Sequence, residues 1–183
     1  MGKISRRELK TGMVIHISGK GLMSRFLRRL FKSKYIHSAI IVVLKGIPFV
    51  MEVTGGRKRK GFKSGWQLVA LDNYVGKGLK RWVSCVQVCP LLNNADQEEL
   101  EKIALKTLEA HTNTVRSDDI NYGYLKALSV VFRRIKGRNP VCSDYVREVF
   151  RGFGIGIRPD LEMILPPQLQ ESKELLSIAE GIE

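Results

Sequence analysis

The sequence has few cysteines, few aromatic residues and few acidic residues, and it contains no long apolar run. Its three cysteines are an odd number and give no disulfide framework of the kind on which small secreted proteins depend. No apolar run reaches the roughly 20 residues that a membrane-spanning helix needs. No apolar segment of signal-peptide length follows the basic N-terminus. We therefore expect a protein that is cytoplasmic, or that is released or packaged without the ordinary secretory route.

The cysteine spacing gives little support for a metal site. Cys85 and Cys89 are separated by three residues within a strand-like run, and no second cysteine pair accompanies them. A structural zinc site usually takes four ligands, often from two such pairs. We therefore expect both cysteines to be core residues, and we expect neither a metal ion nor another cofactor.

The shortage of acidic residues leaves a large positive charge. Lysine and arginine number 31 against 18 aspartate and glutamate residues, for a net charge of +13. Such an excess favours contact with polyanions, which include nucleic acid, anionic lipid and anionic cell-wall polymers. The aromatic residues, 8% of the chain, do not interleave with the basic runs as they would in a base-stacking surface.

One basic segment, between Gly19 and Lys34, is predicted to be an amphipathic helix. Arg25, Arg28 and Arg29 lie between apolar residues that recur at helical spacing. Such a helix either packs its apolar stripe on the core or lies on an anionic membrane or polymer. The stripe comprises Met23, Phe26, Leu27, Leu30 and Phe31.

A glycine-rich loop at residues 55–65 is the second basic segment. Arg57, Lys58 and Arg59 lie in this loop, which directly follows a predicted strand. The loop is either a solvated surface or a rim that contacts an anion. We retain these three residues as candidate substrate-binding residues.

Two predicted strands carry polar residues within apolar runs. Tyr35–Leu44 is apolar on both faces, as a central strand is, and His37 lies near its start. Phe49–Thr54 is expected to run antiparallel to it and contains Glu52. Because an unpaired buried carboxylate is costly, Glu52 should be paired or lie at an edge.

The other elements follow from periodicity and capping patterns. His16 lies within a short strand and is expected to be an ordinary strand residue. Asn94 and Gln97 resemble a capping box at the start of a helix. Further strands are expected at residues 13–18, 66–71 and 80–89, and further helices near Ser117 and Asn139.

The stretch from Asn139 to Phe150 predicts a helix with a cysteine in its first turn. Asn139 suits the cap and Pro140 the first helical position. Cys142 then lies among the unpaired N–H groups at the positive end of the helix dipole. This position favours a thiolate. The alternative is that Cys142 is a small core residue.

His37, Glu52 and Cys142 together suggest a thiol hydrolase. A cysteine at a helix N-terminus, facing a histidine that a third polar group orients, is the arrangement of such enzymes. His37 would take the thiol proton and Glu52 would fix the imidazole tautomer. Backbone N–H groups at the helix start would stabilise an oxyanion.

The order histidine, acid, cysteine resembles the circularly permuted NlpC-type, papain-like hydrolases of the YiiX-like group. Ordinary papain-like enzymes place the cysteine before the histidine. The segments similar to the family are Met13–Ser18, His37–Ile40, Met51–Val53, Asn121–Tyr124, Val141–Asp144 and Ile157–Leu161. Ala39 replaces the glycine that usually follows the histidine, and Asp144 replaces a glutamate.

The resemblance implies an α+β fold in which an antiparallel sheet of about five strands packs on helices. We expect one domain over residues 1–183, with a core at about residues 11–167 and an exposed tail at 168–183. It implies that Cys142 is the nucleophile, His37 the base and Glu52 the orienting acid. Tyr124 is a further candidate for the substrate-binding site, as an additional oxyanion donor.

The function expected from this resemblance is that of an amidase or peptidase acting on an anionic substrate. A cell-wall peptide, an acidic peptide or a phospholipid would fit the basic segments. Two alternatives remain open. The protein could be an acyl hydrolase or transferase acting on lipid, or a non-enzymatic basic protein that contacts nucleic acid or a membrane.

Overall fold

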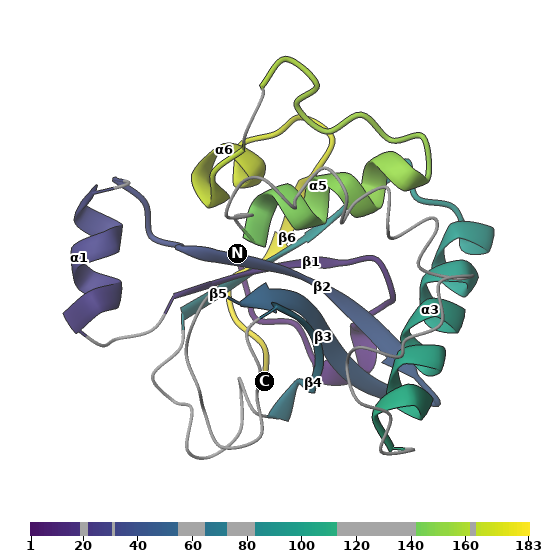
Figure 1. Cartoon of the computed structure of the whole chain (residues 1–183). Coiled ribbons are helices and arrows are strands. Elements are labelled where there is room, and N and C mark those ends of the chain that lie inside the picture. The colour runs from purple at the N-terminus through teal and green to yellow at the C-terminus, as the bar shows by residue number, and fades with distance from the viewer. Residues whose placement is uncertain (19–21, 31, 55–64, 73–82, 113–141, 162–163) are drawn as a thin grey trace.

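A six-stranded antiparallel sheet forms the centre of the computed structural model, in the order β4-β3-β2-β1-β5-β6 (Figure 1). The structure describes residues 1–18, 22–30, 32–54, 65–72, 83–112, 142–161 and 164–183. The strands are β1 (Val14–Ser18), β2 (His37–Leu44), β3 (Ile47–Thr54), β4 (Gly65–Ala70), β5 (Val83–Val88) and β6 (Leu176–Ala179). The α+β class expected from the sequence is therefore confirmed.

The two longest of the described helices cover one face of this sheet. The described helices are η1 (Arg6–Glu8, a 3-10 helix), α1 (Leu22–Leu30), α3 (Asn94–Thr112), α5 (Cys142–Gly152) and α6 (Pro166–Gln170). Helices α3 and α5 lie against the sheet, whereas α1 projects from the end at which β2 begins (Figure 1). None of the helices in the described part of the chain is long and apolar enough to cross a bilayer.

Strand β2 is apolar along both faces because both faces are buried. Ile40 and Val42 point into the core beneath α3 and α5. Ala39 and Ile41 point into a second core, which Ile4 and other N-terminal residues cover. All four β2 side chains are completely buried. This double burial explains why the sequence of β2 lacks the alternation of a strand with one solvated face.

The C-terminal residues form the sixth strand, so the prediction of five strands and an exposed tail was incomplete. Strand β6 pairs with β5, with Val86 opposite Ala179. Leu176 and Ile178 are 54% and 39% exposed, and only Ala179 is buried. An edge strand with so little buried surface has a weak hydrophobic pattern, which is why it resembled a tail.

The cap of α3 lies one residue earlier than predicted. Asn93, and not Asn94, accepts the hydrogen bond from the Asp96 N–H at 3.0 Å. The Asp96 carboxylate in turn accepts from the Asn93 N–H at 3.1 Å. These reciprocal bonds are those of a capping box in which the aspartate Asp96 takes the place of the usual glutamine or glutamate. The helix expected to begin near Ser117 lies outside the described residues.

The Thr11–Gly12 turn joins the start of β1 to the neighbouring elements. The Gly12 N–H donates to the Ile41 carbonyl at 2.9 Å. Gly12 has a φ of +87°, and a Cβ atom there would lie 2.0 Å from Cδ2 of Leu92. The turn therefore requires glycine both for its backbone conformation and for the close approach of Leu92.

We predict that Gly12→Ala lowers the free energy of unfolding by about 2–3 kcal/mol, since it combines left-handed strain with overpacking. Gly46→Ala is the matched control, because Gly46 has a φ of +77° but no atom within 4 Å of the point where an added Cβ would lie. It should cost only about 1 kcal/mol. Urea denaturation measures both values, and equal losses would contradict the packing argument.

Candidate active site

Cys142 is the first residue of α5, at the end of the helix that faces β2. Its Sγ accepts a hydrogen bond from the Ser38 backbone N–H at 3.4 Å. The residue is 8% exposed. The sulfur therefore lies at the positive end of the helix, where backbone donors surround it and little water reaches it. Asn139 and Pro140, the predicted cap, lie outside the described residues.

The core side of α5 holds the helix in place. Tyr145, Val146 and Phe150 are completely buried, and Val149 is 7% exposed. They pack in the same core as β2 residues such as Ile40. This apolar face fixes the helix against the sheet, and its first turn lies beside the start of the inner strand β2.

A second set of contacts fixes the first turn of α5 to the segment that follows the helix. Asp144 Oδ1 accepts hydrogen bonds from the Ile164 N–H and from the Arg147 guanidinium, both at 2.9 Å. Arg147 also donates to the Leu161 carbonyl at 2.6 Å. Ser143 Oγ donates to the Ile164 carbonyl at 2.6 Å. A largely buried polar network thus ties the first turn of α5, which carries Cys142, to Leu161 and Ile164.

His37 and Glu52 meet on neighbouring antiparallel strands. His37 is the first residue of β2 and Glu52 lies in β3. His37 Nε2 lies 2.5 Å from Glu52 Oε2. The Glu52 side chain is 1% exposed and that of His37 is 20% exposed. The buried carboxylate is therefore paired, as the sequence required.

The electrostatics of the cluster favour a thiolate and an imidazolium. Burial by itself would lower the pKa of His37, but Cys142 and Glu52 raise it well above its usual value. Burial would likewise raise the pKa of Cys142, but His37 lowers it, with help from the N–H groups of Ser38 and Ser143. The hydrogen bond between His37 and Cys142 contributes to both shifts. Because Nε2 is engaged by Glu52, Nδ1 is the ring nitrogen left for the sulfur.

His16 is a buried polar residue of the site that the sequence did not single out. It was expected to be an ordinary strand residue, but it is completely buried. Its Nδ1 lies 2.9 Å from Ser38 Oγ, and its Nε2 lies 2.6 Å from Gln87 Oε1. Since Ser38 donates its backbone N–H to Cys142, His16 contacts the residue next to the nucleophile candidate.

The partners of Gln87 determine the tautomer of His16. The Gln87 Nε2 group donates to the Gln170 carbonyl at 2.8 Å and to Ser177 Oγ at 3.0 Å. The Gln87 oxygen therefore faces His16 and accepts from Nε2–H. His16 Nδ1 is then an acceptor, and the Ser38 hydroxyl donates to it. Burial, countered in part by Gln87, together with the charge of His37 lowers the pKa of His16 to about 4, so the ring is neutral near pH 7.

Four of the predicted site residues lie outside the described part of the chain. They are Arg57, Lys58, Arg59 and Tyr124. Their assignment to substrate binding therefore stays a prediction. Cys85 and Cys89 are buried, unpaired thiols, and burial raises the pKa of each. Their position agrees with the core role expected for them.

The chain matches no family model and no curated protein sequence. Its structure is similar to the crystal structure of the metalloprotein YiiX from Escherichia coli O157:H7, described as DUF1105. The TM-score is 0.60 at 15% identity, and the match covers 95% of this chain and 98% of the other. At this identity the likeness shows a shared fold.

The description of YiiX as a metalloprotein raises the question of a metal site in this chain. Among the residues that the structure describes, no three histidine, cysteine, aspartate or glutamate side chains are placed to hold a metal ion. Within the cluster, His37 already bonds to Glu52 and to Cys142. These residues satisfy one another directly and do not form an open ligand set.

We predict that Cys142 is alkylated by iodoacetamide at pH values well below the ~8.5 of an ordinary thiol. His37→Ala should move the pH profile back towards that of an ordinary thiol. Cys85 and Cys89 serve as internal controls, because they are buried and their pKa values are raised. Peptide mass spectrometry separates the three sites, and an unchanged profile in His37→Ala would contradict the proposed ion pair.

We also predict that His16 makes the folded protein sensitive to mild acid. Its pKa is lowered from 6.5 to about 4, so the unfolded chain binds more protons between these pH values. The free energy of unfolding should therefore fall as the pH falls from 6.5 to 4, by about 3 kcal/mol from this residue.

His16→Gln removes this titration and keeps a polar side chain. The variant should show a smaller loss of stability over the same pH interval, measured by urea denaturation at several pH values. The difference between the two proteins cancels the contribution of the carboxylates. Equal pH slopes would show that His16 is not held neutral.

Proposed function

We propose that this protein is a cysteine-dependent hydrolase of the amidase or peptidase type, with a permuted papain-like fold. The observation that carries the proposal is the position of His37 between Cys142 and Glu52, with Cys142 at the start of α5. Their chain order is that of the circularly permuted NlpC-type group. The fold likeness to YiiX supports the assignment.

In the proposed mechanism the Cys142 thiolate attacks the carbonyl carbon of a substrate amide. The C–S bond forms and the carbonyl π electrons move to oxygen. Backbone N–H groups of the first turn of α5, that of Cys142 among them, stabilise this oxyanion. His37 then donates its proton to the departing amine as the tetrahedral intermediate collapses, which leaves a thioester on Cys142.

Water completes the cycle. His37, now neutral, takes a proton from water as the hydroxide oxygen attacks the thioester carbonyl. Collapse of the second intermediate releases a carboxylic acid and restores the thiolate and imidazolium. Glu52 holds the ring through Nε2 and stabilises its charged form, which keeps Nδ1 directed at the sulfur.

We further propose that the substrate is anionic, as a cell-wall peptide or an acidic peptide is. The support is the net charge of +13 and the basic helix α1, which lies just before His37 in the chain. A positively charged approach to the site raises the local concentration of an anionic substrate. This attraction weakens as salt screens the charges.

A panel of amide and ester substrates, in matched carboxylate-bearing and neutral forms, tests the proposal. We predict that Cys142→Ala lowers kcat/KM by at least about 10³-fold, since it removes the nucleophile. Glu52→Gln should lower it less than Cys142→Ala does, because the ring keeps a partner without the charge. Turnover of the carboxylate-bearing substrates should fall with rising salt.

Cys89→Ala is the matched control, because Cys89 lies in the core and outside the cluster. It should keep activity near the parent level. Intact-protein mass spectrometry should show an acyl adduct that Cys142→Ala does not form. Turnover that survives in Cys142→Ala would overturn the proposed nucleophile, and salt-independent turnover would overturn the anionic substrate.

A further inference from the structure

Helix α1 exposes two large apolar side chains on one face. Leu22 is 83% exposed and Phe26 is 61% exposed. They are four residues apart and therefore adjacent on the helix surface. The sequence left open whether the apolar stripe of this helix packs on the core, and at Phe26 it does not. Exposed apolar residues grouped on a projecting helix usually mark an interaction surface.

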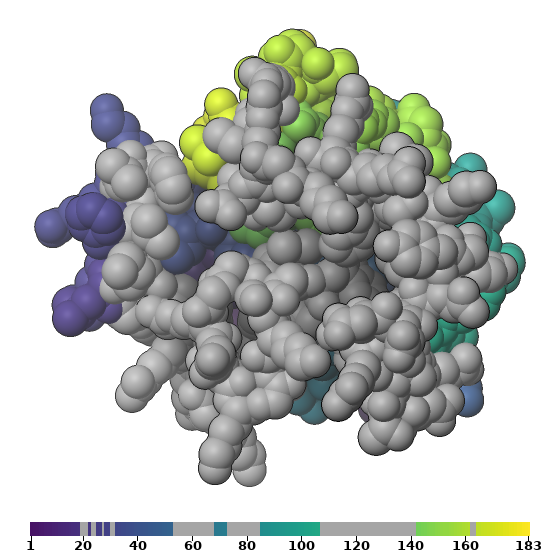
Figure 2. Space-filling model, viewed as in Figure 1, coloured from purple at the N-terminus to yellow at the C-terminus, as the bar shows by residue number. Residues whose placement is uncertain are grey.

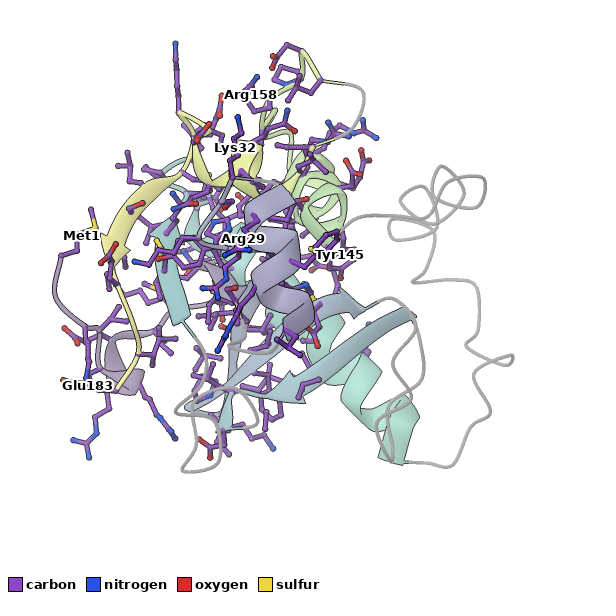
Figure 3. The ribbon with its side chains drawn as sticks, turned by 90° about the vertical axis from the view of Figure 1, so that its left-hand side faces the viewer. Met1, Arg29, Lys32, Tyr145, Arg158 and Glu183 are labelled. Atoms are coloured by element: carbon purple, nitrogen blue, oxygen red, sulfur yellow. The ribbon has the colours of Figure 1, made fainter. Side chains whose placement is uncertain are left out.

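Basic side chains surround these apolar residues. Arg25 and Arg29 are exposed, and Arg28 is half-buried. Figure 3 shows Arg29 on α1 and Lys32 just after it, both on the side of the molecule that faces the viewer. Among the described side chains, no carboxylate forms an ion pair with the three arginines of α1.

An open hollow of about 630 Å³ lies against the helix. Its lining comprises the three arginines of α1, Leu22, Phe26 and the Ser33–Lys34 turn. No acidic side chain of the described residues lines the hollow. Lys34 pairs with Glu180 at 3.4 Å, whereas the buried Nε of Arg28 has no hydrogen-bond partner. The described residues of α1 lie at the left edge of the face that Figure 2 shows.

A short, hydrogen-bonded turn connects this surface to the candidate active site. The Ser33 N–H donates to the Arg28 carbonyl at 3.0 Å. Ser33 Oγ also accepts from the Tyr35 N–H at 3.1 Å and donates to the Tyr35 carbonyl at 2.8 Å. Tyr35 is 2% exposed, and His37 follows two residues later. Helix α1 is therefore held at the end of the sheet where the cluster lies (Figure 1).

We propose that α1 is a docking surface for a membrane that contains anionic phospholipid. Leu22 and Phe26 enter the boundary between headgroups and acyl chains, while Arg25, Arg28 and Arg29 bind lipid phosphates. Charge complementarity and the exposed apolar pair together select this partner. Nucleic acid would satisfy the arginines, but it would leave Leu22 in water. The single ring of Phe26 is also no platform for stacking successive bases.

The docking goes beyond the proposed hydrolase chemistry and does not require it. Cys142→Ala should therefore bind vesicles as the parent protein does. Loss of enzymatic activity would leave the docking proposal standing, and loss of docking would leave the hydrolase proposal standing. The two proposals are distinguishable by the same pair of proteins.

The test is co-sedimentation of the full chain with equimolar phosphatidylcholine–phosphatidylserine vesicles and with pure phosphatidylcholine vesicles. We expect binding to the anionic vesicles alone. Arg25→Glu with Arg29→Glu should weaken it at least about 25-fold, at roughly fivefold for each lost basic contact. Phe26→Ser should weaken it at least about fivefold, since it removes the aromatic ring that the lipid boundary would bury.

Matched controls remove the same chemistry elsewhere on the surface. Arg7→Glu with Lys10→Glu changes two exposed basic residues outside α1, and Leu91→Ser changes an apolar residue that is 62% exposed. Both should bind as the parent protein does. Equal weakening by the Arg7 and Lys10 changes would show that net charge alone drives binding, which overturns a docking role for α1.

Insertion is tested directly with Phe26→Trp. Its added fluorescence should shift to shorter wavelength with anionic vesicles, because the indole leaves water for the lipid boundary. Circular dichroism confirms that each variant is folded. No shift, full binding by Phe26→Ser, or retention on an oligonucleotide without vesicle binding would each overturn the proposal.

Discussion

The contact between His37 and the buried Glu52 carboxylate is the interaction on which the candidate site depends. A carboxylate that is 1% exposed is stable as an anion only with a partner, and His37 Nε2 is that partner at 2.5 Å. The bond uses one ring nitrogen and leaves the other for Cys142. It also makes a charged ring favourable, which in turn stabilises the thiolate. Pairing of adjacent strands thus sets both the geometry and the protonation state of the cluster.

Parts of the fold and the site were predictable because their signals are local. The apolar run of β2 predicted a central strand, and its double burial bears this out. The cap pattern of Asn139 and Pro140 ahead of an apolar face predicted that Cys142 lies in the first turn of a helix, and α5 begins at Cys142. Glu52 was conspicuous because an acid inside an apolar strand requires a partner. Each of these arguments needed only a few neighbouring residues.

The rest depends on contacts between segments far apart in the sequence. His16 binds Ser38, 22 residues away, and Gln87, 71 residues away, and nothing near it in the chain signals such partners. Strand β6 was missed because an edge strand buries little, and the helix pattern of α1 did not tell whether its apolar side chains meet the core or the solvent. Amphipathic periodicity is the same in both cases. Only the exposed fractions of Leu22 and Phe26 distinguish them.

Backbone hydrogen bonds join the N-terminal and C-terminal segments of the chain. The Glu180 N–H donates to the Gly2 carbonyl at 2.9 Å, and the Ile4 N–H to the Gly181 carbonyl at 3.1 Å. Ile4 and Ile182 form an isolated parallel bridge. A short peptide linker would therefore close this chain into a ring with little rearrangement. Reopening the ring at the exposed Leu91 turn would place Cys142 ahead of His37 along the chain, so the order of these two residues in the sequence depends only on where a closed loop is cut.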